Sequence, residues 1–551
     1  MKRLISLVLF LVTMLSLFGC NNTQPQNTQT EPPKQMDVSG KYVLDTLRNE
    51  AIINDAGVVN TSVDGNARVY YQIFVGSFSD SNSDGIGDLR GIINRFDYLN
   101  DGNPNSGVSL GIEGIWLSPI FDSPTYHKYD VIDYYKIDPD FGTQQDLKDL
   151  IALCQERNVQ VILDLVLNHT SKTHVWFQKF VAAHKDNDPD NPYYDYYTYS
   201  DKPIPGRGFS KIAGTEHYYE CNFSGDMPEL NYDNEAVRQA MLDVAKYYLE
   251  LGVDGFRFDA AKYLYYGEES RNVAFWQWYM DELRKIKPDI YTVAEVWDSD
   301  SATYPYFSAT NCFNFTMSQT SGMVARAAAG GNVNDFTSYI ESYLSHIHAQ
   351  NPNAMMAPFI ANHDMDRSAG FLPFINGRAK IAANLNLLLP GTPYIYYGEE
   401  IGLKGSRGSA NTDANRRLAM LWGDGDTVKD PIGTTYNSPQ SNGTVADQKP
   451  DGNSLYNYYK KVIQARKANP EIAYGSFQAL RFSGTKVGGF ISTYEGKSVA
   501  VIHNTTQGEL TVDLSTVTDL SFTTLAAILG DSATLNGTTL TLAPQTSVIL
   551  R

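Results

Sequence analysis

The sequence has few cysteines and a shortage of positive charge. Only 4 of its 551 residues are cysteine, and their spacing matches neither a zinc site nor a thioredoxin motif. Lys and Arg number 44 against 62 Asp and Glu, which gives a net charge of −18. This balance argues against a phosphate-seeking surface, so we predict no binding of nucleic acid. The hydrophobic fraction of 42% is ample for large cores and excludes global disorder.

Long apolar runs are also scarce. The run Leu4–Phe18 follows a short basic start and is too short for an ordinary membrane span. It leads into Gly19-Cys20, which resembles the end of a bacterial lipoprotein signal. We therefore predict a signal peptide over residues 1–19 and lipidation of Cys20. The mature chain is then an exported cell-envelope lipoprotein that meets the membrane only through its lipid anchor; plain secretion is the alternative.

The next segments carry no core of their own. Residues 20–37 are polar and proline-bearing, which is typical of a flexible tether. Residues 38–67 are a preamble to which the sequence assigns no fold. A tether after a lipid-bearing cysteine holds a soluble body away from the membrane surface.

A regular alternation of short apolar runs and amphipathic segments begins at about residue 68. Eight runs rich in Val, Ile, Phe and Tyr are strand candidates, and helix-like stretches such as Gln144–Arg157, Asn234–Leu251 and Ala274–Lys287 lie between several of them. The strand candidates are Val69–Phe78, Gly114–Ile120, Val159–Leu167, Gly255–Asp259, Tyr291–Val296, Phe313–Met317, Met356–Ile360 and Tyr394–Tyr397. Strands that alternate with helices favour a parallel sheet, and eight repeats predict an α/β fold, the (β/α)8 TIM barrel.

Two further domains interrupt and follow this barrel. We assign residues 68–169 and 234–469 to the barrel, and 170–233, dense in Tyr, Asp, Pro and Gly, to a small domain inserted after the third strand. Residues 470–551 change character: Asn536-Gly537 between two threonine-rich runs predicts a tight hairpin. This end is predicted to be a C-terminal antiparallel β-sandwich domain.

Carboxylates stand where the predicted strands end, and barrel enzymes place their catalytic groups there. Side chains alternate along a strand, so Arg257 and Asp259 share one face while two phenylalanines share the other. The arginine would keep the aspartate ionised and oriented, as a nucleophile requires. Glu295 stands among apolar neighbours in sequence, and burial would raise its pKa and keep it protonated as a general acid. Asp364 ends the seventh strand, and we expect all three carboxylates to converge on one rim.

These segments resemble the conserved regions of the α-amylase family of glycoside hydrolases. Each motif is weak alone, but all of them occur in order and at strand ends over residues 68–551. The matching segments are DLVLNH at 164–169, MPELN at 227–231, GFRFDAAK at 255–262, AEVW at 294–297 and ANHD at 361–364, with Tyr129-Asp130-Val131 and Tyr396–Glu400 in agreement.

The resemblance implies a role for each matching position. It makes Asp259 the nucleophile, Glu295 the acid/base and Asp364 the residue that stabilises the distorted sugar. The positions implied to bind substrate are Tyr129 as an aromatic platform, His169 and His363 on sugar hydroxyls, Arg257 beside the nucleophile and Lys262 beyond the cleaved bond. From the residues themselves, we expect Asp164 to hold Arg257.

The implied activity is hydrolysis of α-1,4-glucosidic bonds of starch and maltodextrins by a retaining, endo-acting α-amylase. Retention places the two carboxyl groups roughly 5–5.5 Å apart. Many α-amylases have histidine where this chain has Tyr263, so other activities of the family stay open: a neopullulanase or cyclomaltodextrinase, an exo-α-glucosidase, or a glucanotransferase. A non-catalytic glucan-binding surface protein is a further alternative, against which the presence of all three carboxylates argues.

A second cluster predicts a calcium site with a structural role. The loop from Asp80 to Asp88 places oxygen ligands at its first, third and fifth positions and glycine at its sixth, as calcium loops begin. The expected Ca²⁺ ligands are Asp80, Asn82, Asp84, the carbonyl of Ile86, and Asp88. Two questions stay open in the sequence: a second calcium ion at Asn168 and Asn231, and a disulfide between Cys221 and Cys312.

Overall fold

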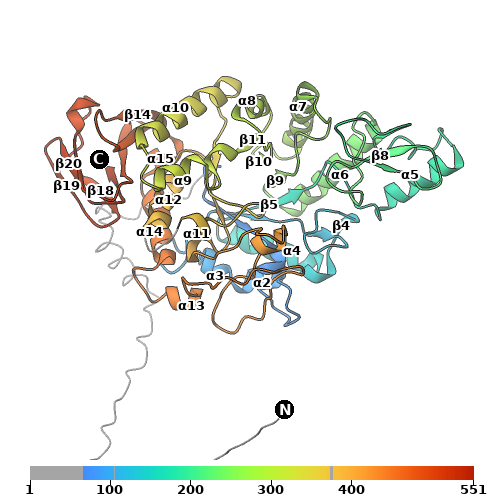
Figure 1. The fold of residues 1–551 in the computed structure, drawn as a ribbon, viewed down its shortest axis with the longest axis horizontal. Coiled ribbons are helices and arrows are strands. Elements are labelled where there is room, and N and C mark those ends of the chain that lie inside the picture. The colour runs from blue at the N-terminus through green and yellow to red at the C-terminus, as the bar shows by residue number, and fades with distance from the viewer. Residues whose placement is uncertain (1–65, 105, 373–376) are drawn as a thin grey trace, which may run out of the picture. The chain divides into compact units, whose positions relative to one another are not determined.

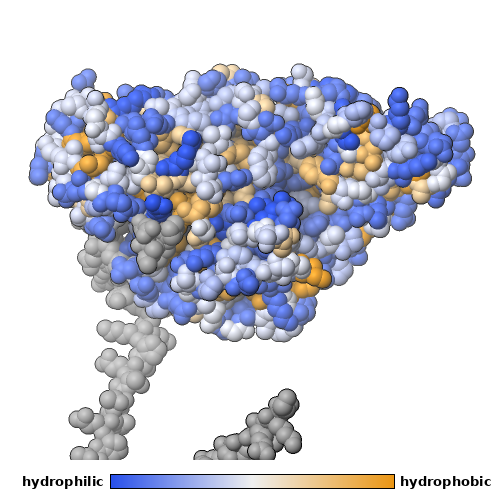
Figure 2. Space-filling model, viewed as in Figure 1, coloured by the Kyte–Doolittle hydropathy of each residue, from blue (hydrophilic) through white to orange (hydrophobic). Residues whose placement is uncertain are grey.

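The computed structural model describes residues 66–551, apart from residue 105 and residues 373–376. The signal peptide 1–19, Cys20, the tether 20–37 and the preamble up to residue 65 lie outside the described residues, so export and lipidation stay predictions. Across the described part, no helix combines the length and the apolar character needed to cross a membrane. The face drawn in Figure 2 is mostly hydrophilic, with small groups of apolar residues.

Eight parallel strands form the predicted barrel (Figure 1), in the order β12-β11-β10-β9-β5-β2-β1-β13. The strands are β1 Tyr70–Ile73, β2 Gly114–Leu117, β5 Gln160–Leu165, β9 Gly255–Phe258, β10 Tyr291–Ala294, β11 Asn311–Asn314, β12 Ala357–Pro358 and β13 Tyr394–Tyr396. Their fully buried positions explain the continuous apolar runs that predicted them.

All eight strands end before the predicted position, and the first, sixth and seventh differ most. The first ends at Ile73, and its predicted end contains the 3-10 helix η1, Val75–Ser77. The sixth strand ends at Asn314, and the predicted end Phe315–Met317 is a short 3-10 helix, η4. The seventh is only Ala357–Pro358, because proline has no N–H to extend the ladder.

The barrel closes between β12 and β13 through the residues at their starts. The N–H of Thr392 donates to the carbonyl of Met356 at 2.9 Å. The preceding Gly391 has φ +84, and a Cβ there would stand 2.2 Å from that same carbonyl oxygen. Only glycine therefore allows this approach without displacing the backbone.

Helices cover the sheet, and several of them, though not α7, begin at recognisable side-chain caps. In α4, Thr143 and Asp146 form a reciprocal capping box, and in α6 the side chain of Asn234 accepts from the N–H of Ala236. The helices outside the insertion are α2 Leu89–Asn94, α3 Phe96–Leu99, α4 Gln144–Glu156, α6 Glu235–Leu251, α7 Glu269–Ile286, α8 Asp300–Thr303, α9 Met323–Ala328, α10 Val333–Gln350, α11 Ser368–Phe371, α12 Arg378–Leu387, α13 Val445–Gln448, α14 Leu455–Lys467 and α15 Pro470–Tyr474.

The segment between β5 and α6 is the expected insertion. It contains α5 Val175–Asp186 and a three-stranded antiparallel sheet in the order β6-β8-β7, and Figure 1 shows α5 and β8 together in green. The strands are β6 Tyr199–Ser200, β7 Phe209–Lys211 and β8 Tyr218–Glu220. An antiparallel bridge between His169 and Glu229 joins its last part to the end of the third barrel strand.

The C-terminal part consists of two antiparallel sheets, β14-β15-β16-β21-β18 and β17-β20-β19, with a hydrophobic core between them. The hairpin predicted at Asn536-Gly537 joins β19 to β20. Ion pairing of Arg481 with Glu341 of α10 ties β14 to the barrel. The strands are β14 Ser476–Arg481, β15 Gly488–Tyr494, β16 Lys497–Asn504, β17 Leu510–Asp513, β18 Leu525–Leu529, β19 Ala533–Asn536, β20 Thr539–Leu542 and β21 Thr546–Leu550.

Candidate active site

Arg257 is the centre of a cluster of carboxylates at the carboxyl ends of the barrel strands. It lies on β9 and is 1% exposed. Its Nη1 donates to Asp259 Oδ1 at 2.5 Å, and its Nη2 stands 3.0 Å from Glu295 Oε2. The same Nη1 donates to Asp164 Oδ1 at 2.8 Å, which confirms the expected contact between Asp164 and Arg257. One guanidinium thus joins three carboxylates that come from three strands.

The alternation of β9 produces this arrangement. Phe256 and Phe258 are buried on the opposite face, where Phe258 packs on Trp276 of α7 with ring centroids 4.5 Å apart. After Asp259 the chain turns sharply, because Ala260 adopts the left-handed conformation with φ +47. Its N–H then donates to Glu295 Oε2 at 3.0 Å. A left-handed alanine carries strain of the kind that functional sites maintain.

Asp364 has a separate pair of partners. His363 Nε2 stands 3.0 Å from Asp364 Oδ2, and Arg417 Nη2 donates to Asp364 Oδ1 at 2.8 Å. Burial alone would raise the pKa of Asp364, but His363 and Arg417 outweigh it and hold that pKa well below its usual range. The ionised form of Asp364 is therefore strongly favoured.

The carboxyls on Arg257 respond differently. Burial raises the pKa of Asp259, and Arg257 opposes this rise without cancelling it. Burial also raises the pKa of Glu295; Arg257 lowers it, and the charge of Asp259 raises it further. Two carboxyls on one buried cation share a proton readily, which suits an acid and a nucleophile working together.

The expected surroundings of Glu295 are wrong, although the direction of its pKa shift is confirmed. Its carboxylate accepts from Ala260 and pairs with Arg257 rather than facing apolar side chains. The apolar residues Ala294 and Val296 are its buried neighbours along the chain, at and just beyond the end of β10.

Tyr129 and the two histidines lie at the same end of the barrel. The Tyr129 ring stacks on His363 at 5.4 Å, and its hydroxyl donates to Asp164 Oδ2 at 3.0 Å. His169 is buried, which lowers its pKa to about 4 and leaves it neutral. Among the described residues, its Nε2 has no hydrogen-bond partner. A buried neutral nitrogen of this kind is suited to a hydroxyl group of a ligand.

Lys262 lies close by but is engaged with the protein. Its Nζ donates to the Trp297 carbonyl at 2.7 Å and to Asp298 Oδ2 at 2.8 Å. Trp297 itself is 41% exposed and stacks on Phe315 at 5.0 Å. Phe223 of the insertion is 49% exposed, contacts the ring of Tyr263, and lies 5.4 Å from the ring of His169. Trp297 and Phe223 therefore each expose an aromatic surface near residues of the site.

Several residues of the site were not predicted from the sequence. They include Arg417, Phe223, Trp297, Gln72 and Trp116. Trp116 Nε1 donates to Asp164 Oδ2 at 3.2 Å, and Arg257 lies over its ring. Trp297 offered a signal, since it stands two residues after Glu295; Arg417 is 53 residues beyond Asp364 and no pattern links them.

The predicted calcium loop joins η1 Val75–Ser77 to α2 and is held by its own hydrogen bonds. Asp80 accepts from three backbone N–H groups and from Thr427, and Asp88 caps α2 at Gly91. Asn82 and Asp84 are exposed and each accepts from the N–H two residues on. Within the described residues, no three His, Cys, Asp or Glu side chains stand together as a ready metal site. The loop nevertheless offers only oxygen donors, which suits Ca²⁺.

The two open questions of the sequence receive structural detail. Cys154, Cys221 and Cys312 are all buried free thiols, so the pairing of Cys221 with Cys312 is absent. The amide of Asn231 donates to the carbonyl of Asp195 at 2.9 Å, whereas Asn168 Oδ1 is buried without a partner among the described residues.

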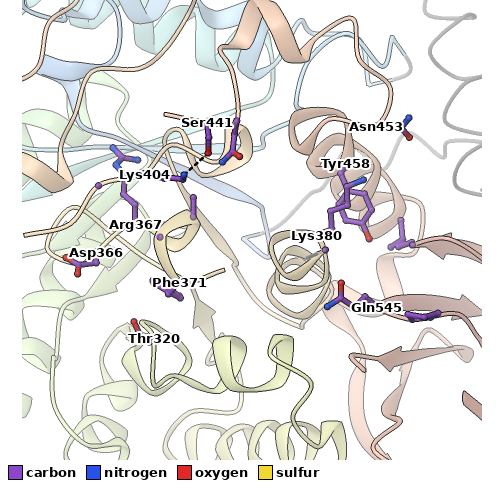
Figure 3. A pocket seen from close by; sticks show the side chains of 18 of the residues that line it. Thr320, Asp366, Arg367, Phe371, Lys380, Lys404, Ser441, Asn453, Tyr458 and Gln545 are labelled. Carbon is purple, nitrogen blue, oxygen red and sulfur yellow. Dashed lines mark hydrogen bonds between the residues drawn. The ribbon is translucent and has the colours of Figure 1, made fainter. Parts of the chain in front are cut away.

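A cavity of about 1550 Å³ lies apart from the carboxylate cluster. It is bounded by the residues after β12 and β13 and by the C-terminal sheets; Figure 3 shows Asp366 and Arg367 on one side and Tyr458 and Gln545 on the other. The dashed line there is the hydrogen bond from Lys404 to Ser441. Asp259 and Glu295 do not line this cavity, so we place no chemistry in it.

Comparison with known proteins gives a consistent result. The family model for the α-amylase catalytic domain matches residues 72–475. Alpha-amylase 3 of Dictyoglomus thermophilum is 34% identical over 454 residues, which cover 81% of this chain and 86% of that protein. The 4-alpha-glucanotransferase of Thermotoga neapolitana is 30% identical over 453 residues, or 80% of this chain and 96% of the relative. Among solved structures, Eubacterium rectale Amy13B matches with a TM-score of 0.82 at 33% identity, covering 89% of this chain and 96% of that one.

Proposed function

The chain belongs to the α-amylase family of enzymes acting on α-glucans, and from this premise we propose that it is a retaining, endo-acting hydrolase of α-1,4-glucosidic bonds in starch and maltodextrins. One observation carries the proposal: Arg257 holds Asp259 and Glu295 at the same time. Two carboxyl groups on one guanidinium are close enough to act on the two sides of a single glycosidic bond.

The chemistry follows from the two carboxyls. Glu295, protonated because burial raises its pKa, gives its proton to the leaving oxygen. Asp259 attacks the anomeric carbon and forms a glycosyl-enzyme. The now ionised Glu295 takes a proton from a water molecule whose oxygen attacks the anomeric carbon and breaks the bond to Asp259, which releases the sugar with its configuration retained. Asp364, held ionised by His363 and Arg417, stabilises positive charge as it develops on the sugar.

Neutral and aromatic groups supply the binding surface. Tyr129 offers a ring face to the sugar at the cleavage point, while the Nε2 of His169, unpartnered within the residues that the structure describes, reaches its hydroxyls. His363 holds Tyr129 and Asp364 in place. Lys262, bonded to Trp297 and Asp298, would shape the aglycone side rather than contribute an unpaired charge.

A second activity, transfer of the glycosyl group to another glucan, has its own support. The exposed rings of Trp297 and Phe223 can hold a sugar acceptor by stacking, which would let the acceptor compete with water. The relative from Thermotoga neapolitana is named a glucanotransferase. We rank transfer second to hydrolysis, because the carboxylate cluster can perform hydrolysis without a bound sugar acceptor.

We also propose that the loop from Asp80 to Asp88 binds Ca²⁺ as a structural ion. Its donor set of carboxylates, an amide oxygen and a carbonyl matches the oxygen ligands that calcium takes. The ion would tie the end of β1 to α2, and none of the chemical steps above involves it.

The test is a product time course on a long linear dextrin with detection of the anomer released. We expect mixed short products early, with retained α-configuration. Asp259→Asn should lower kcat by roughly 10⁴-fold or more while still binding dextrin. Asp243→Asn, an exposed acid of α6, is the matched control and should behave as the unmodified protein.

Each other outcome has a definite meaning. Glucan products longer than the substrate would favour transfer, and glucose alone would favour an exo-glucosidase. Release of the β-anomer would contradict the retaining mechanism. Dextrin binding with no turnover by the unmodified protein would leave a non-catalytic glucan-binding protein.

A further inference from the structure

Gln72 lies behind the site on β1 and reaches one of its histidines. It is buried, at 2% exposure. Its Nε2 stands 2.7 Å from His363 Nδ1. The chemical steps derived above make no use of this residue, and the family resemblance assigned it no role.

The other nitrogen of His363 has two partners. Nε2 stands 3.0 Å from Asp364 Oδ2 and 2.6 Å from the hydroxyl of Tyr129. The hydroxyl proton of Tyr129 is donated to Asp164, so the Tyr129 oxygen accepts at His363 Nε2, which must therefore carry a proton. Asp364, 3.0 Å away, can only accept as well. If His363 is neutral, its Nδ1 is a lone pair, and that lone pair requires a donor. The amide N–H of Gln72 is a donor in the right place.

The surroundings hold the ring in this orientation. His363 stacks on Tyr129 and meets the edge of Trp116 at 5.8 Å. Several titratable and charged groups surround His363. They are Asp364 and Arg417 in the loops that follow β12 and β13, Tyr129 and His127 in the segment between β2 and α4, Asp164 on β5, and Arg257 and Asp259 on and just after β9. Because these charges act on the ring in opposite directions, the protonation state of His363 depends on the hydrogen-bond partner of its Nδ1.

We propose that Gln72 is a positioning residue that fixes His363 as its neutral Nε2–H tautomer and thereby holds that N–H at the Tyr129 hydroxyl, beside Asp364. This inference rests on the hydrolytic function proposed above. Gln72 does not touch the reacting atoms in this account. An amide can donate a hydrogen bond to Nδ1 without carrying charge. The imidazole ring therefore neither takes up a second proton nor flips its orientation.

The decisive variant is Gln72→Glu, which replaces the donor by a carboxylate of the same length. A carboxylate at Nδ1 stabilises the doubly protonated ring and raises the pKa of His363. His363 would then stay cationic into the neutral range. We expect the acid limb of kcat/KM to move to higher pH by at least one unit, with KM nearly unchanged. Gln72→Asn, whose amide is too short to reach, should lower kcat about ten-fold without that shift.

The matched control is Gln160→Glu. Gln160 is also a glutamine on a barrel strand, and it accepts a hydrogen bond from Tyr70 at the amino ends of the strands. It should lose some thermal stability and leave the pH profile unchanged. If Gln72→Glu only lowers stability and keeps the pH profile of the unmodified protein, Gln72 is structural and the proposal is wrong.

Nitrogen NMR of the histidine side chains separates this inference from the proposed function. The sequence has 9 histidines, and His363→Gln identifies the resonance of interest. We expect Nε2–H with a bare Nδ1 in the unmodified protein, and both nitrogens protonated in Gln72→Glu at neutral pH. If these spectra are seen but the unmodified protein does not hydrolyse dextrin, the proposed function is wrong and the tautomer assignment stands. If dextrin is hydrolysed but the two proteins give identical spectra, the tautomer assignment alone is wrong.

Discussion

Arg417 shows how much one side chain contributes to the state of a carboxylate. It is buried, and its Nη2 binds Asp364 while its Nε donates to the carbonyl of His363. Arg417→Gln removes a charge that lowers the pKa of Asp364. That pKa should rise, so the ionised form is lost at a higher pH on acidification. We expect kcat/KM to fall by about 100-fold, with its acid limb moved to higher pH.

The control for this change lies on the same loop. Arg407→Gln removes an exposed arginine whose carboxylate partner is Asp413, and such exposed pairs contribute little. The two variants are compared by their pH–rate profiles. An unchanged acid limb in Arg417→Gln would show that His363 alone sets the ionisation of Asp364.

Single residues of the site were predictable where strand alternation applies. Placing Arg257 beside Asp164 and Asp259 needed only a period of two along β9 and the meeting of parallel strand ends. The contacts of Gln72 and Arg417 could not be predicted, because they depend on rotamers and on loops that approach from distant parts of the chain. The surroundings of Glu295 were mistaken for the same reason: its neighbours in space come from β9, not from its own strand.

Closure of the barrel depends on Gly391, where β13 begins. Gly391→Ala puts a methyl group 2.2 Å from the Met356 carbonyl and also strains a φ of +84. Gly496→Ala, in the turn between β15 and β16, has a similar φ of +76 and nothing within 4 Å. We expect a loss of about 1 kcal/mol for Gly496→Ala and on the order of 3 kcal/mol or more for Gly391→Ala.

Thermal unfolding of the two variants measures this difference. The shared left-handed conformation cancels between them, so the excess loss reports the clash at the strand junction. Equal midpoints would mean that β12 and β13 separate at little cost and that the barrel does not need this approach.

The existence and order of the barrel strands were predicted, but their ends were placed one to five residues too far along the chain, and the smaller elements were not predicted at all. Buried parallel strands are continuous apolar runs, and α4 and α6 carry visible caps. The strands β6, β7 and β8 have only two or three residues each, too few for a period to show. They exist because β8 pairs with both neighbours, a long-range fact that local sequence does not contain.

The stability of the whole molecule should respond to calcium if the loop at 80–88 binds it. A ligand of the folded state alone stabilises by mass action, about 2.7 kcal/mol at 100 times its Kd. We expect the thermal midpoint to rise on addition of Ca²⁺ and to fall on chelation. Asp84→Asn keeps the acceptor for the Ile86 N–H but removes a charge, and should abolish the response.

Asp519→Asn, an exposed acid of the C-terminal part, is the control and should keep the calcium response. If the unmodified protein has the same thermal midpoint with chelator as with Ca²⁺, the proposed calcium site is wrong. The loop would then be held by its own hydrogen bonds, as the Asp80 and Asp88 contacts already allow.

The three buried thiols have a practical consequence for the molecule as a whole. Cys154, Cys221 and Cys312 sit in three different neighbourhoods and none is bonded to another. The described residues contain no disulfide, so we expect folding to depend neither on redox potential nor on a thiol oxidase or disulfide isomerase. Expression of residues 66–551 under reducing and under oxidising conditions should therefore yield the same folded body.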